Sequence, residues 1–196
     1  MDRPKIVFAC GEAGAVTTSD AQIAKTVRML RDHGQAKKYY HDLEGYNGRL
    51  DAIQAGLLSV KLKNLPKWTS QRREAARRYN ELFREVGAVV TPFEPEGSRA
   101  VYHLYVVRVE DRERLQADLA SQNIGTGIHY PVPLHLQKAY VHLGYRAGDF
   151  PVAERLAPQI VSLPMFPQLR SDQIERVVAA VSEAVSESSW VHSDIV

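Results

Sequence analysis

Residues 123–140 read NIGTGIHYPVPLHLQKAY, and three kinds of local structure are expected in turn along this stretch. The segment Ile124–His129 is a candidate β-strand. Two prolines then predict a stiff loop, because each proline fixes its own φ and has no backbone N–H to donate. A short helix is expected over Leu134–Leu143. We therefore expect a strand, a shaped loop and a short helix in succession.

Strands and helices also alternate on either side of this stretch. Apolar runs bounded by turn residues predict strands at Ala88–Thr91, Val101–Val109 and Ile160–Leu163. Helical spacing of apolar residues, with a capping residue or an early proline, predicts helices at Asp111–Gln122, Pro151–Ala157 and from Ser171 onward. This alternation indicates an α/β fold.

The amino-terminal part of the chain follows the same alternation. Strands are expected at Ile6–Cys10 and Ala13–Thr17. A helix should follow, with Ser19 as its N-cap and Gln22 completing a capping box. A second helix is expected to begin near Asn47. Its apolar stripe is Leu50, Ile53, Leu57 and Val60.

A third helical pattern ends at Gly87 and links the two halves of the chain. Its stripe is Trp68, Arg72, Ala76, Tyr79 and Phe83. Two arginine pairs, at 72–73 and 77–78, recur at helical spacing among glutamates, which predicts a solvated face. The boundary between two lobes is expected within the helices around Lys61–Glu85.

Composition narrows the function classes. A net charge of +2 is too small to indicate a nucleic-acid or acidic-membrane partner. The single cysteine, Cys10, excludes an intramolecular disulfide and favours a reducing compartment, so a cytoplasmic location is expected. No metal site is expected, because the histidines show no ligand spacing and two prolines separate His129 from His135. No apolar run approaches the ~18 residues that span a bilayer.

A second segment, residues 44–55, reads EGYNGRLDAIQA. Together with residues 123–140, it resembles signature segments of the DegT/DnrJ/StrS-type sugar aminotransferases. The resemblance implies the remainder of a type I aminotransferase large domain over 1–65 and a connecting helix over 66–86. It also implies a small carboxy-terminal α/β domain over 87–187 and a tail over 188–196. On this resemblance the chain is expected to begin about halfway along the family's sequence.

The resemblance also implies a chemistry. The family carries pyridoxal 5'-phosphate and moves an amino group, with glutamate as the expected donor, onto the keto group of a nucleotide-linked hexose. A homodimer is implied. The acidic group, the aromatic ring and the helix N-terminus that hold the cofactor lie upstream of the family's lysine. The chain alone is therefore expected to be an incomplete site.

Lys5 is the candidate for the lysine that condenses with the cofactor aldehyde. It stands six positions before Gly11, the same spacing that the family shows before its glycine/acidic/glycine segment. A lysine amine suits both Schiff-base formation and proton transfer when it is kept neutral. The residues that flank Lys5 depart from the family pattern, and a solvated terminal lysine is the alternative.

Asn47 and Arg49 are the candidate cofactor-binding residues. The resemblance implies that Asn47 reaches the phosphate of the neighbouring subunit's cofactor, which an amide NH₂ can bind without a change of charge. Arg49 is the adjacent basic group. From the local sequence alone, Asn47 could instead be a helix N-cap, and Asp51 could hold Arg49 in a surface pair.

The substrate-binding candidates are His129, Tyr130 and His135. The resemblance places their loop beside the sugar-nucleotide pocket, where such side chains can bind hydroxyls or stack on a planar group. The alternative is that the prolines merely shape a turn and the rings pack inward.

A rival from another class is a non-catalytic remnant or split subunit that binds a nucleotide sugar or a partner chain. A nicotinamide oxidoreductase is disfavoured, since no Gly-x-Gly-x-x-Gly joins a strand to a helix.

Overall fold

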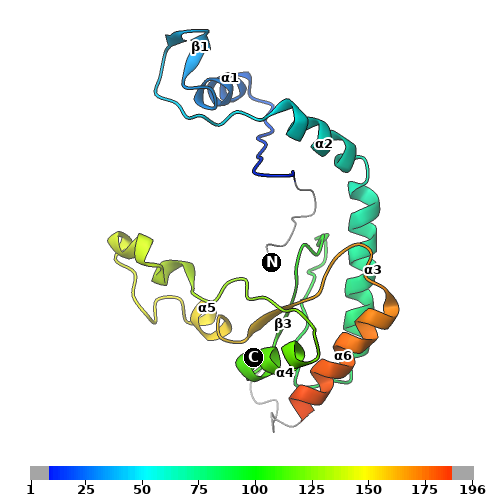
Figure 1. Cartoon of the computed structure of the whole chain (residues 1–196). Helices are drawn as coiled ribbons and strands as arrows, with labels where there is room; N and C mark the ends of the chain where they lie inside the picture. The colour runs from blue at the N-terminus through cyan, green and yellow to red at the C-terminus, as the bar shows by residue number, and fades with distance from the viewer. Residues whose placement is uncertain (1–8, 187–196) are drawn as a thin grey trace. The chain divides into compact units, whose positions relative to one another are not determined.

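The computed structural model describes residues 9–186 of the chain (Figure 1). The chain divides into two compact units, Met1–Pro66 and Lys67–Val196. The assignment of 1–65 to a large domain, 66–86 to a connecting helix and 87–187 to a small domain stays a prediction. The two units are described separately.

The first helix of unit 1, α1 (Ala21–Leu30), is capped by a carboxylate. Asp20 accepts hydrogen bonds from the backbone N–H groups of Gln22 and Ile23, at 2.7 and 3.1 Å. These are two of the donors that a helix start leaves without partners. The predicted cap, Ser19, is therefore wrong by one residue.

After α1, the backbone at Gly34 passes close to that at Leu43, at the base of a small hairpin. Gly34 has φ +77°, and a Cβ there would lie 1.7 Å from the carbonyl oxygen of Leu43, so only glycine fits. The hairpin strands β1 (Gln35–Lys37) and β2 (Tyr40–His41) pair antiparallel. An isolated bridge then joins Asp32 to Asn47. The backbone of Asn47 is thus fixed before the next helix begins.

Helix α2 spans Ala52–Leu62, so it begins later than the start near Asn47 that the sequence predicted. Asn47 is in extended pairing with Asp32 and cannot also be helical. Ile53, Leu57 and Val60 of the predicted stripe lie on α2, whereas Leu50 precedes it, and none of the residues of α2 is buried. Two of its members, Ile53 and Val60, are well exposed. The helical period alone does not say what covers a face.

Two predicted strands of unit 1 have different outcomes. Ala13–Thr17 is irregular and exposed in the structure, so that prediction is wrong. A strand requires a neighbour to accept its hydrogen bonds, and among residues 9–186 no segment pairs with this one. Most of Ile6–Cys10 lies outside the described residues.

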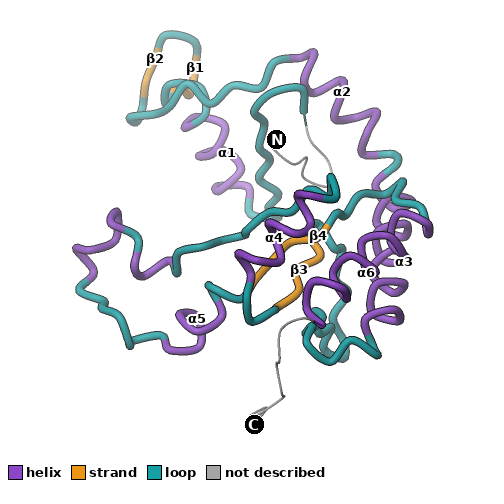
Figure 2. The backbone as a smooth tube through the Cα atoms, turned by 60° about the horizontal axis from the view of Figure 1, so that its bottom comes forward, coloured by secondary structure: helices purple, strands orange, loops and turns teal. Residues whose placement is uncertain are grey.

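The sheet of unit 2 is antiparallel. Its strands β3 (Tyr105–Arg108) and β4 (Ile160–Leu163) pair in register from Tyr105 opposite Leu163 to Arg108 opposite Ile160 (Figure 2). Single bridges extend the pairing on both sides, from Val90 to Arg108 and from Gly127 to Ser162. The predicted strand Ile160–Leu163 is confirmed, and Val101–Val109 is shortened to β3. Ala88–Thr91 and Ile124–His129 are reduced to one bridge each.

Three helices pack with this sheet: α3 (Leu65–Phe83), α4 (Arg112–Ser121) and α6 (Ser171–Ser186). The segment between α4 and β4 carries the 3₁₀ turns η1 (Leu134–Leu136) and η2 (Lys138–Leu143) and the helix α5 (Pro151–Leu156), none of which has a buried residue. Asp111 caps α4 as predicted, accepting from the N–H of Arg114 at 3.0 Å. Pro151 stands in the first turn of α5, also as predicted.

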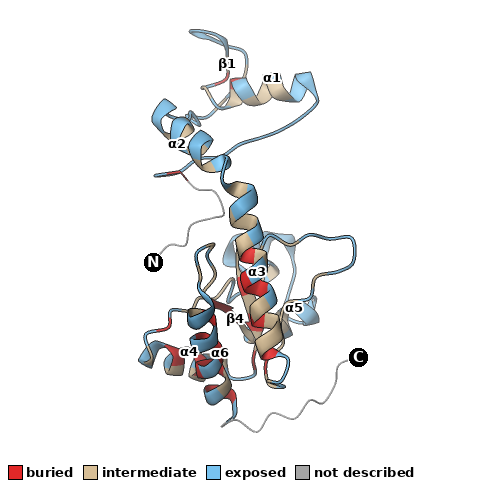
Figure 3. Ribbon diagram, turned by 90° about the vertical axis from the view of Figure 1, so that its right-hand side faces the viewer, coloured by how far each residue is buried: buried red, intermediate tan, exposed pale blue. Residues whose placement is uncertain are grey.

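The core of unit 2 forms where the inner faces of α3, α4 and α6 meet the sheet (Figure 3). At its centre the ring of Tyr79 on α3 stacks on that of Tyr105 on β3, with the ring centroids 4.7 Å apart. Both residues are fully buried. Offset aromatic pairs of this kind contribute about 0.5–1.5 kcal/mol beyond their buried area. The pair joins helix to sheet.

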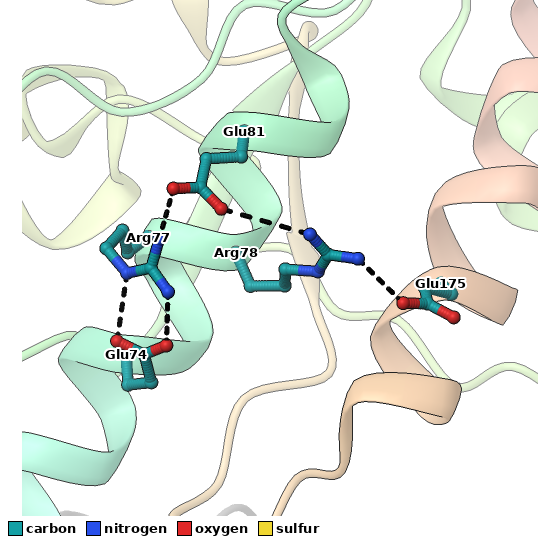
Figure 4. A network of polar contacts seen from close by, with 5 residues as sticks. All are labelled: Glu74, Arg77, Arg78, Glu81 and Glu175. Atoms are coloured by element: carbon teal, nitrogen blue, oxygen red, sulfur yellow. Dashed lines mark hydrogen bonds and ion pairs between the residues drawn. The ribbon is translucent and has the colours of Figure 1, made fainter.

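The outer face of α3 is solvated, as the sequence predicted, and its arginines form ion pairs there (Figure 4). Arg77 pairs with Glu74 and Glu81 on its own helix. Arg78 reaches across to Glu175 on α6, at 2.7 Å. Arg72 departs from that prediction: it is buried, because it lies on the stripe that faces the core.

Candidate functional site

The loop that follows Gly127 is anchored to β4. The N–H of Gly127 donates to the carbonyl oxygen of Ser162 at 3.1 Å, and the N–H of Ser162 donates to that of Gly127 at 2.8 Å. Two residues further on, Nδ1 of His129 lies 2.8 Å from the hydroxyl oxygen of Ser162. The backbone and the side chain of Ser162 thus both hold this segment, and His129 is fixed against the sheet.

Tyr130 is adjacent to His129 but faces outward. Its exposed fraction is 73%. The two rings meet edge to face, with 5.5 Å between their centroids. The pair presents one anchored imidazole and one accessible phenol. Such a pair suits a ligand with hydroxyls and a planar ring.

His135, the third residue predicted for substrate binding, has a different set of contacts. Its Nε2 lies 2.9 Å from Oε1 of Glu154, its side chain is 8% exposed, and its ring lies 4.7 Å from that of Phe150. The structure therefore brings His129 and Tyr130 together, whereas His135 packs against α5. Its predicted contact with substrate stays a prediction.

Glu154 gathers the end of this loop around one carboxylate. It accepts from the backbone N–H of Gly148 at 2.8 Å and from that of Phe150 at 3.2 Å, in addition to its contact with His135. These contacts hold the pKa of Glu154 below its usual range. The hydrogen bond from the Gly148 N–H contributes most, followed by those from the Phe150 N–H and from His135. The carboxylate form thus keeps the loop attached to α5.

The two predicted cofactor-binding residues lie in unit 1 and contact one another. Nε of Arg49 donates to Oδ1 of Asn47 at 3.2 Å, and both residues are exposed. This bond occupies the amide oxygen of Asn47, so its NH₂ is the group of that side chain that can donate to a ligand. An amide NH₂ and a guanidinium are both hydrogen-bond donors that suit a phosphate. The donor set fits the phosphate of the predicted cofactor.

The alternative pairing of Arg49 with Asp51 is not observed, because among the described residues no ion pair joins their side chains. Asp51 precedes α2 but makes no side-chain capping bond. Lys5, the predicted catalytic lysine, lies outside the described residues. Its role therefore stays a prediction.

Residues 9–186 contain no group of three or more His, Cys, Asp or Glu residues arranged to hold a metal ion. No helix in that range has both the length and the apolar character that crossing a bilayer requires.

Sequence reasoning missed two residues that organise the loop, Ser162 and Glu154. Ser162 stands in the apolar run Ile160–Leu163, where a lone serine gives no signal of its own. Glu154 lies in the first turn of a short helix, where an acidic residue is ordinary. Only the folded chain shows that both reach the segment between Gly127 and Phe150.

Comparison with known proteins gives these observations a family. A curated relative from Geobacillus stearothermophilus, named a pleiotropic regulatory protein, is 46% identical over 91% of this chain and 49% of its own length. The dTDP-3-amino-3,6-dideoxy-α-D-galactopyranose transaminase of Aneurinibacillus thermoaerophilus is 43% identical over 86% of this chain and 46% of its own length. The chain spans about half the length of the curated relatives it matches.

A solved structure extends the likeness to the fold. The crystal structure of S. venezuelae DesV in complex with a ketimine intermediate superposes with a TM-score of 0.81 and 36% identity, over 89% of this chain and 46% of that one. The model of the DegT/DnrJ/EryC1/StrS aminotransferase family matches residues 4–182. The fold is thus that of part of a type I aminotransferase, and the chain belongs to the DegT/DnrJ/EryC1/StrS aminotransferase family.

Proposed function

We propose that the complete protein transfers an amino group, from glutamate as donor, to the keto group of a nucleotide-linked hexose, with pyridoxal 5'-phosphate as its cofactor. The observation that carries this proposal is the family match over residues 4–182. A relative 43% identical to this chain is named as a transaminase of a dTDP-linked amino sugar. Because the chain spans about half of such relatives, the activity is proposed for the assembled enzyme.

Pyridoxal 5'-phosphate, when bound, supplies an aldehyde that condenses with amines and a ring that accepts electrons. We assign to the amine of Lys5 both the condensation with that aldehyde and the proton transfers next to it. Asn47 and Arg49 would bind the cofactor phosphate. Their support is the pair of exposed donor groups, held beside one another by a 3.2 Å hydrogen bond.

His129 and Tyr130 would bind the sugar nucleotide. Support comes from the anchored imidazole of His129 and the exposed phenol of Tyr130, whose ring centroids lie 5.5 Å apart. The imidazole can hydrogen-bond an oxygen of the sugar, and the phenol can stack on a planar part of the nucleotide. We keep His135 as a secondary candidate, because its Nε2 already contacts Glu154.

We further propose that the enzyme is a cytoplasmic homodimer. The segment from η1 to α5 exposes several large apolar side chains, and exposed apolar patches favour association. These residues include Leu134, Val141, Leu143, Tyr145 and Val152. The single cysteine, Cys10, is free and exposed, which suits a reducing compartment.

The test is a chimera in which the amino-terminal half of the Aneurinibacillus thermoaerophilus relative precedes this chain. We expect transamination of a dTDP-linked keto sugar with glutamate, because the catalytic groups need only be positioned together. Lys5→Ala should abolish turnover, whereas Lys25→Ala, at an exposed position on α1, should not.

Two outcomes would contradict the proposal. A chimera that folds and binds pyridoxal 5'-phosphate, yet transfers no amino group to any nucleotide-linked keto sugar, would favour the non-catalytic rival. Unchanged turnover in Lys5→Ala would remove Lys5 from the mechanism.

A further inference from the structure

A polar hollow lies on the outer face of α3, where the segment between residues 94 and 102 runs beside the helix. Its volume is about 430 Å³, a size that small-molecule sites commonly have. All of its lining residues belong to unit 2, so one compact unit forms it. The residues of α3 that line it recur at helical spacing and are Ser70, Arg73, Glu74, Arg77 and Asn80.

An ion pair attaches the segment between residues 94 and 102 to α3. Nη1 of Arg73 donates to Oε1 of Glu94 at 2.7 Å and to the carbonyl oxygen of Ala100 at 2.6 Å. Glu94 also accepts from the backbone N–H of Ala100 at 2.8 Å and from the hydroxyl of Tyr102 at 3.1 Å. The wall of the hollow is therefore held to the helix by several hydrogen bonds.

The carboxylate and amide oxygens of this lining already accept hydrogen bonds. Both oxygens of Glu94 are engaged by the contacts just described. Both oxygens of Glu74 accept from the guanidinium of Arg77 (Figure 4). Oδ1 of Asn80 accepts from the hydroxyl of Tyr105, a fully buried residue. A ligand in the hollow therefore meets acceptors that have partners.

Donors, by contrast, are available in the same lining. Arg73 and Arg77 each pair with a glutamate, whereas Arg99 is exposed and has no ion pair within the described structure. Arg99 precedes Ala100, whose backbone is bound on both sides to the ion pair of the wall. The NH₂ of Asn80 is the polar group that this side chain has left to donate. The hollow thus offers one uncompensated positive charge and one neutral donor.

We propose that this hollow binds a small metabolite that carries an oxyanion, either a phosphate or a carboxylate group, with Arg99 as the charged donor and Asn80 as a neutral one. A planar guanidinium matches the spacing of phosphate and carboxylate oxygens, and an amide NH₂ donates to the same kind of oxygen. No residue of this lining is among those assigned above to the cofactor or to the sugar nucleotide. The proposal can therefore stand or fall without the proposed function.

The test is titration of the 196-residue chain with inorganic phosphate and, separately, with the dicarboxylate glutarate. Sodium chloride keeps the ionic strength constant, so general screening of charge does not change during the titration. The side-chain amide signals of Asn80 and the backbone amide signals of residues 98–100 report binding in ¹H–¹⁵N spectra. We expect these signals to shift and to saturate with at least one probe, and the probe that binds identifies the oxyanion. No saturable shift with either probe would overturn the proposal.

Two variants and a matched control show whether the lining residues are responsible. Arg99→Gln should raise the Kd of the bound probe about tenfold, the effect of losing one charge-assisted hydrogen bond. Asn80→Asp should raise it at least as much, because a negative oxygen replaces the donor while the other oxygen still accepts from Tyr105.

The control is Arg155→Gln on α5, which removes the same charge from an exposed arginine outside the hollow and should leave the Kd unchanged. If Arg99→Gln weakens binding no more than Arg155→Gln does, the probe responds to net charge alone and the proposal is wrong. If Asn80→Asp does not fold, as circular dichroism would show, the comparison of the two arginine variants decides alone.

Discussion

Replacing Arg72 tests how α3 holds the sheet of unit 2. The Nη1 of Arg72 donates to the carbonyl oxygen of Met165 at 3.0 Å, just after β4, and more weakly to those of Tyr102 and His103 at 3.3 and 3.4 Å. One guanidinium thus joins α3 to the segment before β3 and to the segment after β4. Its side chain is also part of the buried face of the helix. We predict that Arg72→Ala destabilises unit 2 far more than a surface arginine does.

The magnitude follows from burial and from bond geometry. Arg72 is 3% exposed, and desolvation lowers its pKa, so the charge is held away from water. Losing one good bond from a charged donor costs about 1.5–3 kcal/mol, and the loss of the packed stem adds about 1–2 kcal/mol. The unfavourable burial of the cation offsets part of this sum. We expect Arg72→Ala to lower the free energy of unfolding by about 3 kcal/mol and Arg72→Met, which keeps the apolar stem, by about 1–2 kcal/mol.

The assay is urea unfolding followed by circular dichroism at neutral pH. The control is Arg78→Ala on the same helix, whose exposed ion pair with Glu175 should contribute less than about 1 kcal/mol. If Arg72→Ala costs no more than Arg78→Ala, the carbonyl contacts do not stabilise the fold. If Arg72→Met costs as much as Arg72→Ala, the polar contacts account for nearly the whole effect and the stem for little.

Three further predictions concern the loop, the cofactor and the assembly. The pKa of Glu154 is lowered from its ordinary value of 4.5, so its hydrogen bonds should persist above pH 4.5 and be lost as the pH falls through the lowered pKa of the folded chain. The amide signal of Gly148 should report this change, and in Glu154→Gln it should not change with pH in this range. Asn47→Ala in the chimera should weaken retention of pyridoxal 5'-phosphate on dialysis by about tenfold, with little change in kcat once the cofactor is saturating; equal retention would remove Asn47 from the phosphate site. The chain should self-associate at micromolar concentration in sedimentation, and Leu134→Glu with Val141→Glu should shift it toward monomer; an unshifted oligomer would place the interface elsewhere.

Local patterns predicted the helices of unit 2 well. The stripe of α3 identified Tyr79 and Phe83 as buried, because a helix reports its inward face through its own period. The roles of Asp111 and Pro151 at helix starts were also predicted correctly, because capping and first-turn preferences depend on residues close in the sequence. These predictions depend only on neighbours in the chain, which the sequence contains.

Strands were harder, for a physical reason. Val101–Val109 has suitable residues throughout, yet only Tyr105–Arg108 pairs, because the extent of a strand is set by a distant partner. Ala13–Thr17 has strand-like residues but no partner within the described structure. The apolar stripe of α2 has the same limit, because its spacing predicts a helix but not which element covers its apolar face.

The sequence identified candidate residues for the site, but it did not identify the contacts that those residues make. His129 and Tyr130 do lie together, as neighbours in the sequence must. Ser162 could not be anticipated, because its link to His129 arises from pairing between β4 and Gly127. Glu154 was missed likewise, since its partners are backbone N–H groups that any residue type provides.

The pairing of β3 with β4 has a consequence for how unit 2 forms during synthesis. The ribosome completes β3 before α4, the loop and α5, and β4 follows only after all of them. Until then β3, whose Tyr105 and Val107 are fully buried in the folded chain, lacks the strand that pairs with it. The bridge between Val90 and Arg108 can form earlier, since both residues precede β4. The nascent chain therefore exposes an apolar strand edge for part of its translation, and chaperone contact should concentrate in that interval.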